Sequence, residues 1–425
     1  KEAVEPGPVE WAARREALFA AFNRKGPGDR LFIQVDPDEN AILIDGLSGR
    51  FHYPEHHETG EPIADVAAAK RVSGIYCVDY ETEALTPFGW CRAENLATGT
   101  PIVAYDLATD RLVDDKIVAV HEFPENEALR VAFGKPEFIF SPGHGCVVRN
   151  LWRSRIEVRP ASQLRIHTSM LATAELDGRA EILSDTLVRL LAWFTAEGSY
   201  VKNRTAVRLC QSRAANPDYV AELDALLAGS ARRYEYAARP LVHWYISGRL
   251  AEELDEWAPN KSLNELIGSL TARQARLFLY EFVRADGSWR GGRIPPPGPM
   301  IQVTDFFAER AHGPIIYQRR KDVIDGLQAI AVLAGLRTRL TRRRDREEYT
   351  LFFHKKQRVW STGRRPIRET VRCRLWCPQT SKGTWVARRH GAVFITGNSH
   401  PVDALAYPLA VLYPAYDLVR QQMRE

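Results

Sequence analysis

Residues 394–405 read FITGNSHPVDAL, and this stretch places Gly397–Asn398–Ser399 directly after an apolar, strand-like run. After Ser399 the sequence changes character and becomes a helical pattern. Gly and Asn tolerate positive φ angles and Ser forms local hydrogen bonds, so the three residues are compatible with an ordinary turn. They indicate more than a turn only if a matching motif lies far upstream in the chain.

The composition indicates an ordinary soluble protein of several domains. The 425 residues suffice for about three domains, and 45% are hydrophobic while 26% are charged. No apolar run reaches the ~18 residues of a membrane-spanning helix, and no secretory signal is visible. The six cysteines lack zinc-type spacing, which favours free thiols in a reducing compartment. Because the chain begins at Lys1 rather than Met, we expect a fragment or a processed product.

The net charge of +5 is unevenly distributed along the chain. Residues 337–368 contain 12 Lys or Arg and only 3 Asp or Glu, with aromatic residues between them. Such a mixture suits phosphate contacts combined with base stacking, and a solvated charged face is an equally good interpretation.

Two changes in residue pattern divide the middle of the chain. From Cys77 to about residue 180, short β-rich runs alternate with turn residues, which predicts an all-β module. Helical patterns dominate from Asp185 to about Leu340, and strand patterns then return and end at Asn398. The order of β module, helical segment and β return predicts a nested insertion.

Four residues at the borders of the β segments form one chemical set. Cys77 begins the first segment, His144 lies in a turn after a strand, and Asn398 and Ser399 end the last segment. A thiol at position 77 can attack the carbonyl of Tyr76 and form a thioester, while His144 protonates the departing nitrogen or holds a distorted bond. Ser399 can then accept the acyl group, and Asn398 can cleave the next bond by cyclising. Amide resonance makes proximity the main source of acceleration.

Three sequence blocks resemble those of the intein family. They are CVDYETEALTPFGW at residues 77–90, SPGHG at residues 141–145, where Ser141 replaces the usual Thr, and WVARRHGAVFITGNS at residues 385–399. The resemblance implies an all-β, horseshoe-shaped Hint domain that excises residues 77–398. It also implies that Tyr76 is joined to the residue after Asn398 without any cofactor.

Two positions depart from the intein pattern. Gly397 stands where inteins commonly carry His, so help for the cyclisation of Asn398 must come from elsewhere, and Arg389 and His390 are the candidates. Cys373 stands where inteins often carry Asp or Cys, and we expect it to assist the first steps, with a buried core thiol as the alternative. The other cysteines are interpreted as structural, namely Cys91, Cys146, Cys210 and Cys377.

The helical segment contains one pattern twice. LLAWFTAEG at residues 190–198 and LYEFVRADG at residues 279–287 resemble the two LAGLIDADG motifs of homing endonucleases. The resemblance implies two helices side by side at a pseudo-twofold axis, each ending in a carboxylate, Glu197 and Asp286. These carboxylates would hold Mg²⁺ against double-stranded DNA. Either motif alone is better explained as an ordinary amphipathic helix, whereas the pair, followed by the basic stretch, favours a nuclease.

Two residues test the packing that this pattern requires. Ala192 suits a close approach of the two helices, whereas Glu281 stands where a small residue is expected. The alternative functions are a DNA-binding or nuclease module with a vestigial, non-splicing β domain, and a single nuclease without self-cleavage.

The flanking sequences resemble another family. Removing residues 77–398 joins AAAKRVSGIY to SHPVDALAYPLAVLYP, which resembles the C-terminal, RNase H-like α/β nuclease domain of phage terminase large subunits. The resemblance implies that Asp403 is a metal-binding carboxylate, with a helix cap as the alternative. It also implies an oligomeric packaging motor in the cytoplasm of a bacterial cell, no membrane partner, a monomeric intein, and an ATPase domain upstream of Lys1.

The predicted fold is therefore mixed and has five parts. Two are the terminase fragments 1–76 and 399–425, two are the splicing-domain segments 77–180 and 356–398, and one is the inserted α/β endonuclease 181–355.

Overall fold

The computed structural model describes residues 77–398 apart from short internal stretches. Those stretches are 134–135, 151–154, 166–167, 202–203, 236–239, 289–306, 308–312, 344, 355–358 and 361–365. The predicted terminase fragments, together with Tyr76, Ser399 and Asp403, lie outside the described residues. None of the described helices is long and apolar enough to cross a membrane.

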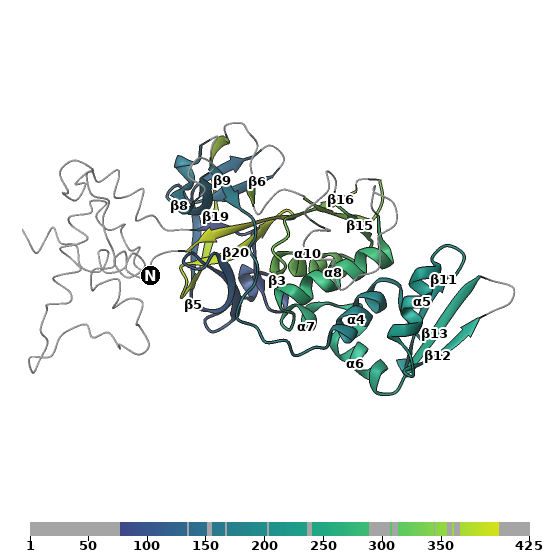
Figure 1. The fold of residues 1–425 in the computed structure, drawn as a ribbon. Helices are drawn as coiled ribbons and strands as arrows, with labels where there is room; N and C mark the ends of the chain where they lie inside the picture. Colours follow the sequence, from purple (N-terminus) through teal and green to yellow (C-terminus); the bar gives the residue numbers. More distant parts are fainter. Residues whose placement is uncertain are drawn as a thin grey trace, which may run out of the picture.

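Short antiparallel strands form both flanks of the helical segment, as the sequence predicts (Figure 1). The first flank contains β1 (Val78–Asp79), β2 (Glu83–Thr86), β3 (Gly89–Arg92), β4 (Pro101–Asp106), β5 (Arg111–Ala132), β6 (Glu137–Phe140), β7 (Gly145–Asn150), β8 (Ile156–Pro160) and β9 (Thr168–Leu171), with the 3₁₀ turns η2 (Ala93–Asn95) and η3 (Ala161–Gln163). The second contains β18 (Val359–Trp360), β19 (Ile367–Thr380), β20 (Thr384–Arg389) and β21 (Ala392–Gly397).

The long strand β19 brings the two ends of the described chain together. It pairs antiparallel with β5 along most of its length and also with β1, where Val78 lies opposite Trp376. These strands belong to a five-stranded sheet of order β19-β1-β6-β5-β4. The segment that precedes the C-terminal border therefore lies directly beside the residue that follows the N-terminal border.

The hairpin β20–β21 carries the C-terminal border. Every residue of both strands is buried, and Thr384 pairs with Gly397 at one end while Arg389 pairs with Ala392 at the other. His390 (φ 46°) and Gly391 (φ 76°) form the two-residue turn between the strands. Tight hairpins need positive φ at both turn residues, which explains the His-Gly sequence locally.

The helical segment contains two units of the same kind. The first comprises α4 (Asp185–Glu197), β10 (Ser199–Tyr200), β11 (Ala206–Ser212), α5 (Pro217–Leu226), β12 (Ala231–Glu235), β13 (Leu241–Ser247), α6 (Arg249–Trp257), the 3₁₀ turn η5 (Pro259–Lys261) and α7 (Asn264–Ile267). The second comprises α8 (Ala272–Asp286), β14 (Gly287–Ser288), β15 (Ile315–Gln318), α10 (Lys321–Leu333), β16 (Thr338–Arg342) and β17 (Tyr349–Phe353).

Strand register shows that the two units are repeats. In the first unit, Ser199 of β10 pairs with Arg208 of β11, which pairs with Tyr245 of β13. In the second unit, Ser288 of β14 pairs in the same way with Ile315 of β15, which pairs with Phe352 of β17. Helices α4 and α8 pack side by side between the two units (Figure 1). The repeat visible in the two sequence motifs therefore extends over whole helix–strand units.

The inserted segment shares a core with the β module. Strand β16 pairs with β21 at Arg339↔Ala392, so one twelve-stranded sheet contains strands from both parts. Helix α10 packs against β3, and the buried guanidinium of Arg388 in β20 forms an ion pair with Asp325 of α10 at 2.7 Å. The two parts therefore form one continuous packing unit.

Candidate functional sites

The turn around residue 141 holds the N-terminal border. Cys77 is completely buried, and its backbone N–H donates to Ser141 Oγ at 3.1 Å. In return the Ser141 N–H donates to the Cys77 carbonyl at 2.9 Å, and the His144 N–H donates to the Ser141 carbonyl at 3.0 Å. The predicted SPGHG block thus fixes the backbone of the predicted nucleophile.

The imidazole of His144 lies in the core beside this backbone. It stacks on the ring of Phe140, with centroids 4.6 Å apart and an interplanar angle of 12°, and its Nε2 shares a hydrogen bond with Thr396 Oγ1. Burial lowers the pKa of His144 to about 3, although a hydrogen bond to the Cys77 backbone acts in the opposite direction. The imidazole is therefore neutral at neutral pH.

A second thiol lies against the first one. Cys377 faces Cys77 across the β1–β19 pairing, and the two side chains share a hydrogen bond. The pKa of Cys77 is raised by burial and, to a smaller degree, by Cys377. Cys373 is half-buried at the edge of the same apolar cluster. The structure thus places Cys377, which the sequence analysis interprets as structural, in the position expected for Cys373.

The carboxamide of Asn398 is buried at the other border. Only 4% of the residue is exposed, and its Nδ2 donates to the carbonyl of Thr380 at 3.3 Å and to Thr380 Oγ1 at 3.2 Å. Its backbone N–H donates to the Gly383 carbonyl at 3.1 Å. Thr380 was not predicted from the sequence, because its place beside Asn398 depends on the turn between β19 and β20 and on the pairing of Thr384 with Gly397.

Two chains of contacts connect the borders, as the sequence analysis requires. Thr396, two residues before Asn398, contacts the imidazole of His144, which forms a hydrogen bond with the Cys77 backbone. On β19, Cys377 faces Cys77 and Thr380 binds Asn398. These two residues are separated by about 10 Å of strand, at about 3.3 Å per residue. A neutral imidazole and one strand thus link the two borders.

The predicted helpers for Asn398 lie elsewhere. His390 is in the hairpin turn, about 17 Å of strand away from Gly397, and its Nε2 lies 2.9 Å from Glu81. Arg389 forms ion pairs with Asp79, Glu81 and Glu137. The expectation that His390 or Arg389 assists the cyclisation is therefore corrected, because the hairpin holds both residues at the end opposite Asn398.

Helices α4 and α8 end next to each other in Glu197 and Asp286, as predicted. A Cβ at Gly198 would lie 2.5 Å from the Phe194 carbonyl oxygen, and one at Gly287 would lie 2.5 Å from the Val283 carbonyl oxygen. Both helices therefore need glycine after the carboxylate. The shared requirement explains the acid–glycine pairs that end both motifs.

Asp286 perturbs the carboxyl group of Glu197. Burial and, to a lesser degree, Asp286 raise the pKa of Glu197 to about 7, and burial raises the pKa of Asp286. Burial likewise lowers the pKa of Lys261, while the two carboxylates act in the opposite direction. Gln211 Nε2 donates to Glu197 Oε2 at 3.0 Å. Lys261 and Gln211 complete a polar cluster that sequence reasoning missed.

The donor set fits a divalent cation. Glu197 and Asp286 supply carboxylate oxygens, the ligands that Mg²⁺ prefers, and two like charges close together gain from a cation between them. In the described part of the chain no three His, Cys, Asp or Glu side chains form a metal-binding group. Mg²⁺ is commonly bound by one or two carboxylates, with waters and phosphate oxygens as its other ligands.

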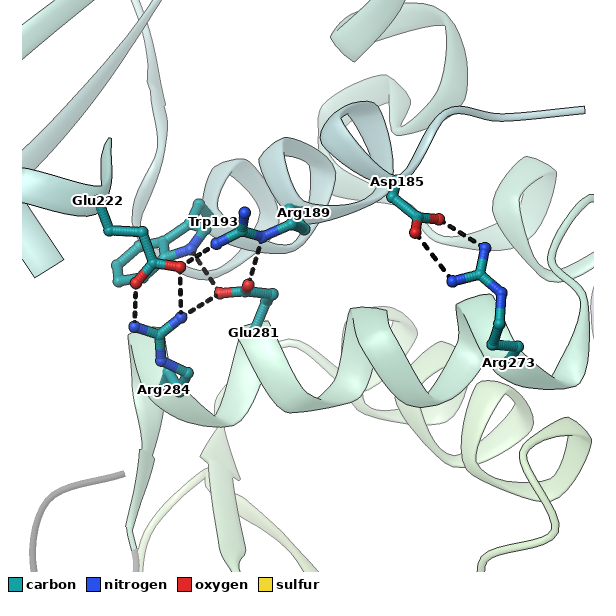
Figure 2. A network of polar contacts seen from close by, with 7 residues as sticks. All are labelled: Asp185, Arg189, Trp193, Glu222, Arg273, Glu281 and Arg284. Atoms are coloured by element: carbon teal, nitrogen blue, oxygen red, sulfur yellow. Dashed lines mark hydrogen bonds and ion pairs between the residues drawn. The ribbon is translucent and has the colours of Figure 1, made fainter. Parts of the chain in front are cut away.

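Glu281 replaces small-residue packing with a buried ionic network (Figure 2). Its fully buried carboxylate accepts hydrogen bonds from Arg189 Nε at 2.6 Å, Trp193 Nε1 at 3.0 Å and Arg284 Nη1 at 2.8 Å. Glu222 of α5 pairs with both arginines. The carboxylate at position 281 is thus satisfied by three donors, and the two from α4, Arg189 and Trp193, tie α8 to α4.

Replacing Glu281 by alanine is expected to destabilise the protein by about 3–5 kcal/mol, because it leaves Arg189 and Arg284 short of a partner inside the core. Denaturant unfolding measures this change. The exposed pair Asp185–Arg273 is the control, and Asp185→Asn is expected to cost less than about 1 kcal/mol. Equal costs for the two variants would contradict the importance of the buried network.

Solved structures of two kinds resemble parts of the chain. A bacterial intein-like domain from Clostridium thermocellum covers 23% of this chain and 68% of its own, at 17% identity and a TM-score of 0.21. A variant of the Ssp DnaB mini-intein covers 25% and 69%, at 10% identity and a TM-score of 0.21. Variants of the homing endonuclease I-DmoI cover 41% and 85%, at 11% identity and a TM-score of 0.29.

I-DmoI has been solved with DNA and with Mn, Mg or Ca. No family model and no curated protein matches the sequence. TM-scores this low do not assign a function to the chain, and the proposals below rest on the geometry of the two sites.

Proposed function

We propose that residues 77–398 form a self-splicing element that excises itself and joins Tyr76 to Ser399. The observation that supports this most strongly is the connection between the borders: Cys77, His144 and Asn398 are all buried and are linked through Thr396 and β19. A buried thiol alone is compatible with a structural role, and it is its connection to a buried imidazole and a buried carboxamide at the other border that supports the proposal.

Each group has a proposed role in the first step. Cys77 Sγ attacks the carbonyl carbon of Tyr76, and the bond to the Cys77 nitrogen breaks, so the acyl group moves from nitrogen to sulfur. Burial keeps the thiol protonated at rest, and as the bond breaks the thiol proton passes to the Cys77 nitrogen, so the step is balanced. A neutral His144 acts as a hydrogen-bonding group on the Cys77 backbone, which favours orientation of the scissile bond over outright protonation.

The later steps use the second border. Ser399 Oγ takes the acyl group from Cys77, and Asn398 then cyclises and releases the ligated product. Its buried carboxamide and the clamped backbone of residues 397–398 are already ordered for this reaction. Ordering the reactants in advance supplies most of the acceleration, because the amide bond itself is unreactive.

The inserted repeats are proposed to cleave double-stranded DNA. Glu197 and Asp286 would hold Mg²⁺, which when bound supplies a Lewis acid for phosphodiester hydrolysis. Lys261 balances the two negative charges, and the exposed arginines of the β16–β17 hairpin, among them Arg342 and Arg346, suit phosphate contacts. The surrounding sequence, including Asp403, is proposed to be a terminase nuclease fragment, on the sequence resemblance alone.

The first acyl shift can be tested with the Asn398→Ala variant, which cannot complete the reaction. Incubation with an excess of a small thiol is expected to release residues 1–76, because an external thiol attacks a thioester but not an amide. Mass analysis of the released fragment measures the step. Absence of thiol-dependent release from a folded variant would contradict the proposed chemistry at Cys77.

Metal binding at the carboxylate pair is expected to depend on pH. Because the pKa of Glu197 is raised to about 7, the carboxylate form that binds Mg²⁺ becomes more abundant as pH rises from 6 to 8. The increase in melting temperature caused by Mg²⁺ should therefore be larger at pH 8 than at pH 6. In Glu197→Gln this pH dependence should disappear, and its persistence would locate the titrating group elsewhere.

A further inference from the structure

Thr380, the last residue of β19, contacts the reacting nitrogen of the second border. Both its carbonyl oxygen and its Oγ1 accept from Asn398 Nδ2, at 3.3 and 3.2 Å, and both residues are at most 4% exposed. We propose that Thr380 holds and polarises Nδ2 for cyclisation, a task for which Gly397 offers no side chain. This inference deepens the splicing function proposed above and rests on it.

A further hydrogen bond fixes the direction of the threonine hydroxyl. Thr380 Oγ1 donates its own proton to the carbonyl of Thr384 at 2.7 Å. A hydroxyl has one proton to donate, so this oxygen can only accept from Asn398. The carboxamide nitrogen therefore faces two acceptors from one residue, and neither acceptor can turn away without breaking a buried bond.

The backbone next to the reacting group is clamped on both sides. Trp385 Nε1 donates to the Gly397 carbonyl at 3.2 Å, and the Asn398 N–H donates to the carbonyl of Gly383. Gly383 itself has a φ of +70° in the turn that leads into β20. With the preceding peptide unit fixed, the free motions of Asn398 are rotations of its side chain and rotation about its own Cα–C bond, which turns the carbonyl that is to be attacked.

The chemistry explains why an acceptor is useful at this position. A bond forms between Nδ2 and the main-chain carbonyl carbon of Asn398, and the bond from that carbon to the nitrogen of Ser399 breaks. Nδ2 gives up one proton and the departing nitrogen gains one, so the reaction is balanced. Because Nδ2 becomes more acidic as the new bond forms, its hydrogen bonds to Thr380 strengthen toward the transition state, which lowers the barrier.

The test separates the two cleavages. In a Cys77→Ala background only C-terminal cleavage occurs, and adding Thr380→Val is expected to slow the release of residues 399–425 about tenfold, the loss of one such hydrogen bond. In an Asn398→Ala background the same substitution should leave thiol-induced release of residues 1–76 unchanged. Thr380→Ser keeps the hydroxyl and should restore C-terminal cleavage to within about twofold.

Thr86→Val is the matched control, since it removes another buried threonine hydroxyl of the same β module, one that donates to the Gly89 carbonyl at 2.8 Å. It should leave C-terminal cleavage unchanged. If Thr380→Val slows both cleavages equally, or slows neither, the proposed role of Thr380 is wrong while the splicing function still stands. If the Cys77→Ala and Asn398→Ala parents both release nothing, the splicing function fails and this inference fails with it.

Discussion

Replacing Cys77 by alanine is expected to abolish the ligated product completely while the chain remains folded. Without the sulfur no thioester can form, and the next residue has no nucleophile to take its place. The loss of one buried sulfur should cost only about 1–2 kcal/mol of stability, so a folded protein remains available for assay. Gel analysis of the precursor and mass analysis of its products measure the effect.

Cys146 is the matched control for this substitution. It is also completely buried in the β module, and burial raises its pKa as well, but it contributes to a different apolar cluster from Cys77. Cys146→Ala should lose a similar amount of stability and still give the ligated product. Ligation by Cys77→Ala, or loss of ligation in both variants, would contradict the assignment of the nucleophile.

Replacing Asp286 by asparagine is expected to lower DNA cleavage by about a thousandfold or more, while DNA binding is retained. Asparagine has nearly the same shape but no charge, so it removes a metal ligand and leaves the fold intact. Nicking of a supercoiled plasmid that carries the joined coding sequence of residues 1–76 and 399–425, with Mg²⁺ present, measures cleavage. A gel-shift assay without the metal measures binding.

Two further substitutions show whether the loss of cleavage is specific to the carboxylate pair. Glu197→Gln should reduce cleavage as strongly, because both carboxylates belong to one site. Asp185→Asn removes a carboxylate at the opposite end of α4 and should cleave normally. If Asp286→Asn cleaves as fast as the unchanged protein, the carboxylate pair is structural and the proposed nuclease site is wrong.

The sequence predicted the features that depend on local patterns. Strand-like runs, the two acid–glycine helix ends and the border residues could be recognised because each is written in consecutive residues. In the described residues, strands precede and follow a segment of helix–strand units, and Glu197 and Asp286 lie at the ends of adjacent helices.

Contacts that depend on strand register could not be predicted in this way. Cys377 faces Cys77 because β19 pairs with β1 in one register, and a shift by one residue would turn its side chain away. Thr380 reaches Asn398 because the turn between β19 and β20 sets it beside Thr384, which pairs with Gly397. The resemblance to inteins pointed instead to Cys373, four residues earlier. Lys261 was missed for a related reason, since it reaches the carboxylates from a turn outside both motifs.

The packing between insert and β module was also invisible in the sequence. Arg388 reaches Asp325 and Gln328 of α10, at 2.7 and 3.2 Å, and these residues are far apart along the chain. Glu281 shows the converse case, because the sequence revealed a departure from the motif but not the partners that satisfy it. Partners of buried charges are set by tertiary structure, which residue patterns do not encode.

The central claim is that the thiol and the carboxamide at the two borders carry out one reaction together. The most direct measurement is the intact mass of every product formed after expression of the unchanged chain. We predict two masses, that of residues 1–76 joined to residues 399–425 and that of free residues 77–398 with a cyclised C-terminal residue. A single species with the mass of the full 425-residue chain, folded and stable under reducing conditions, would contradict the account.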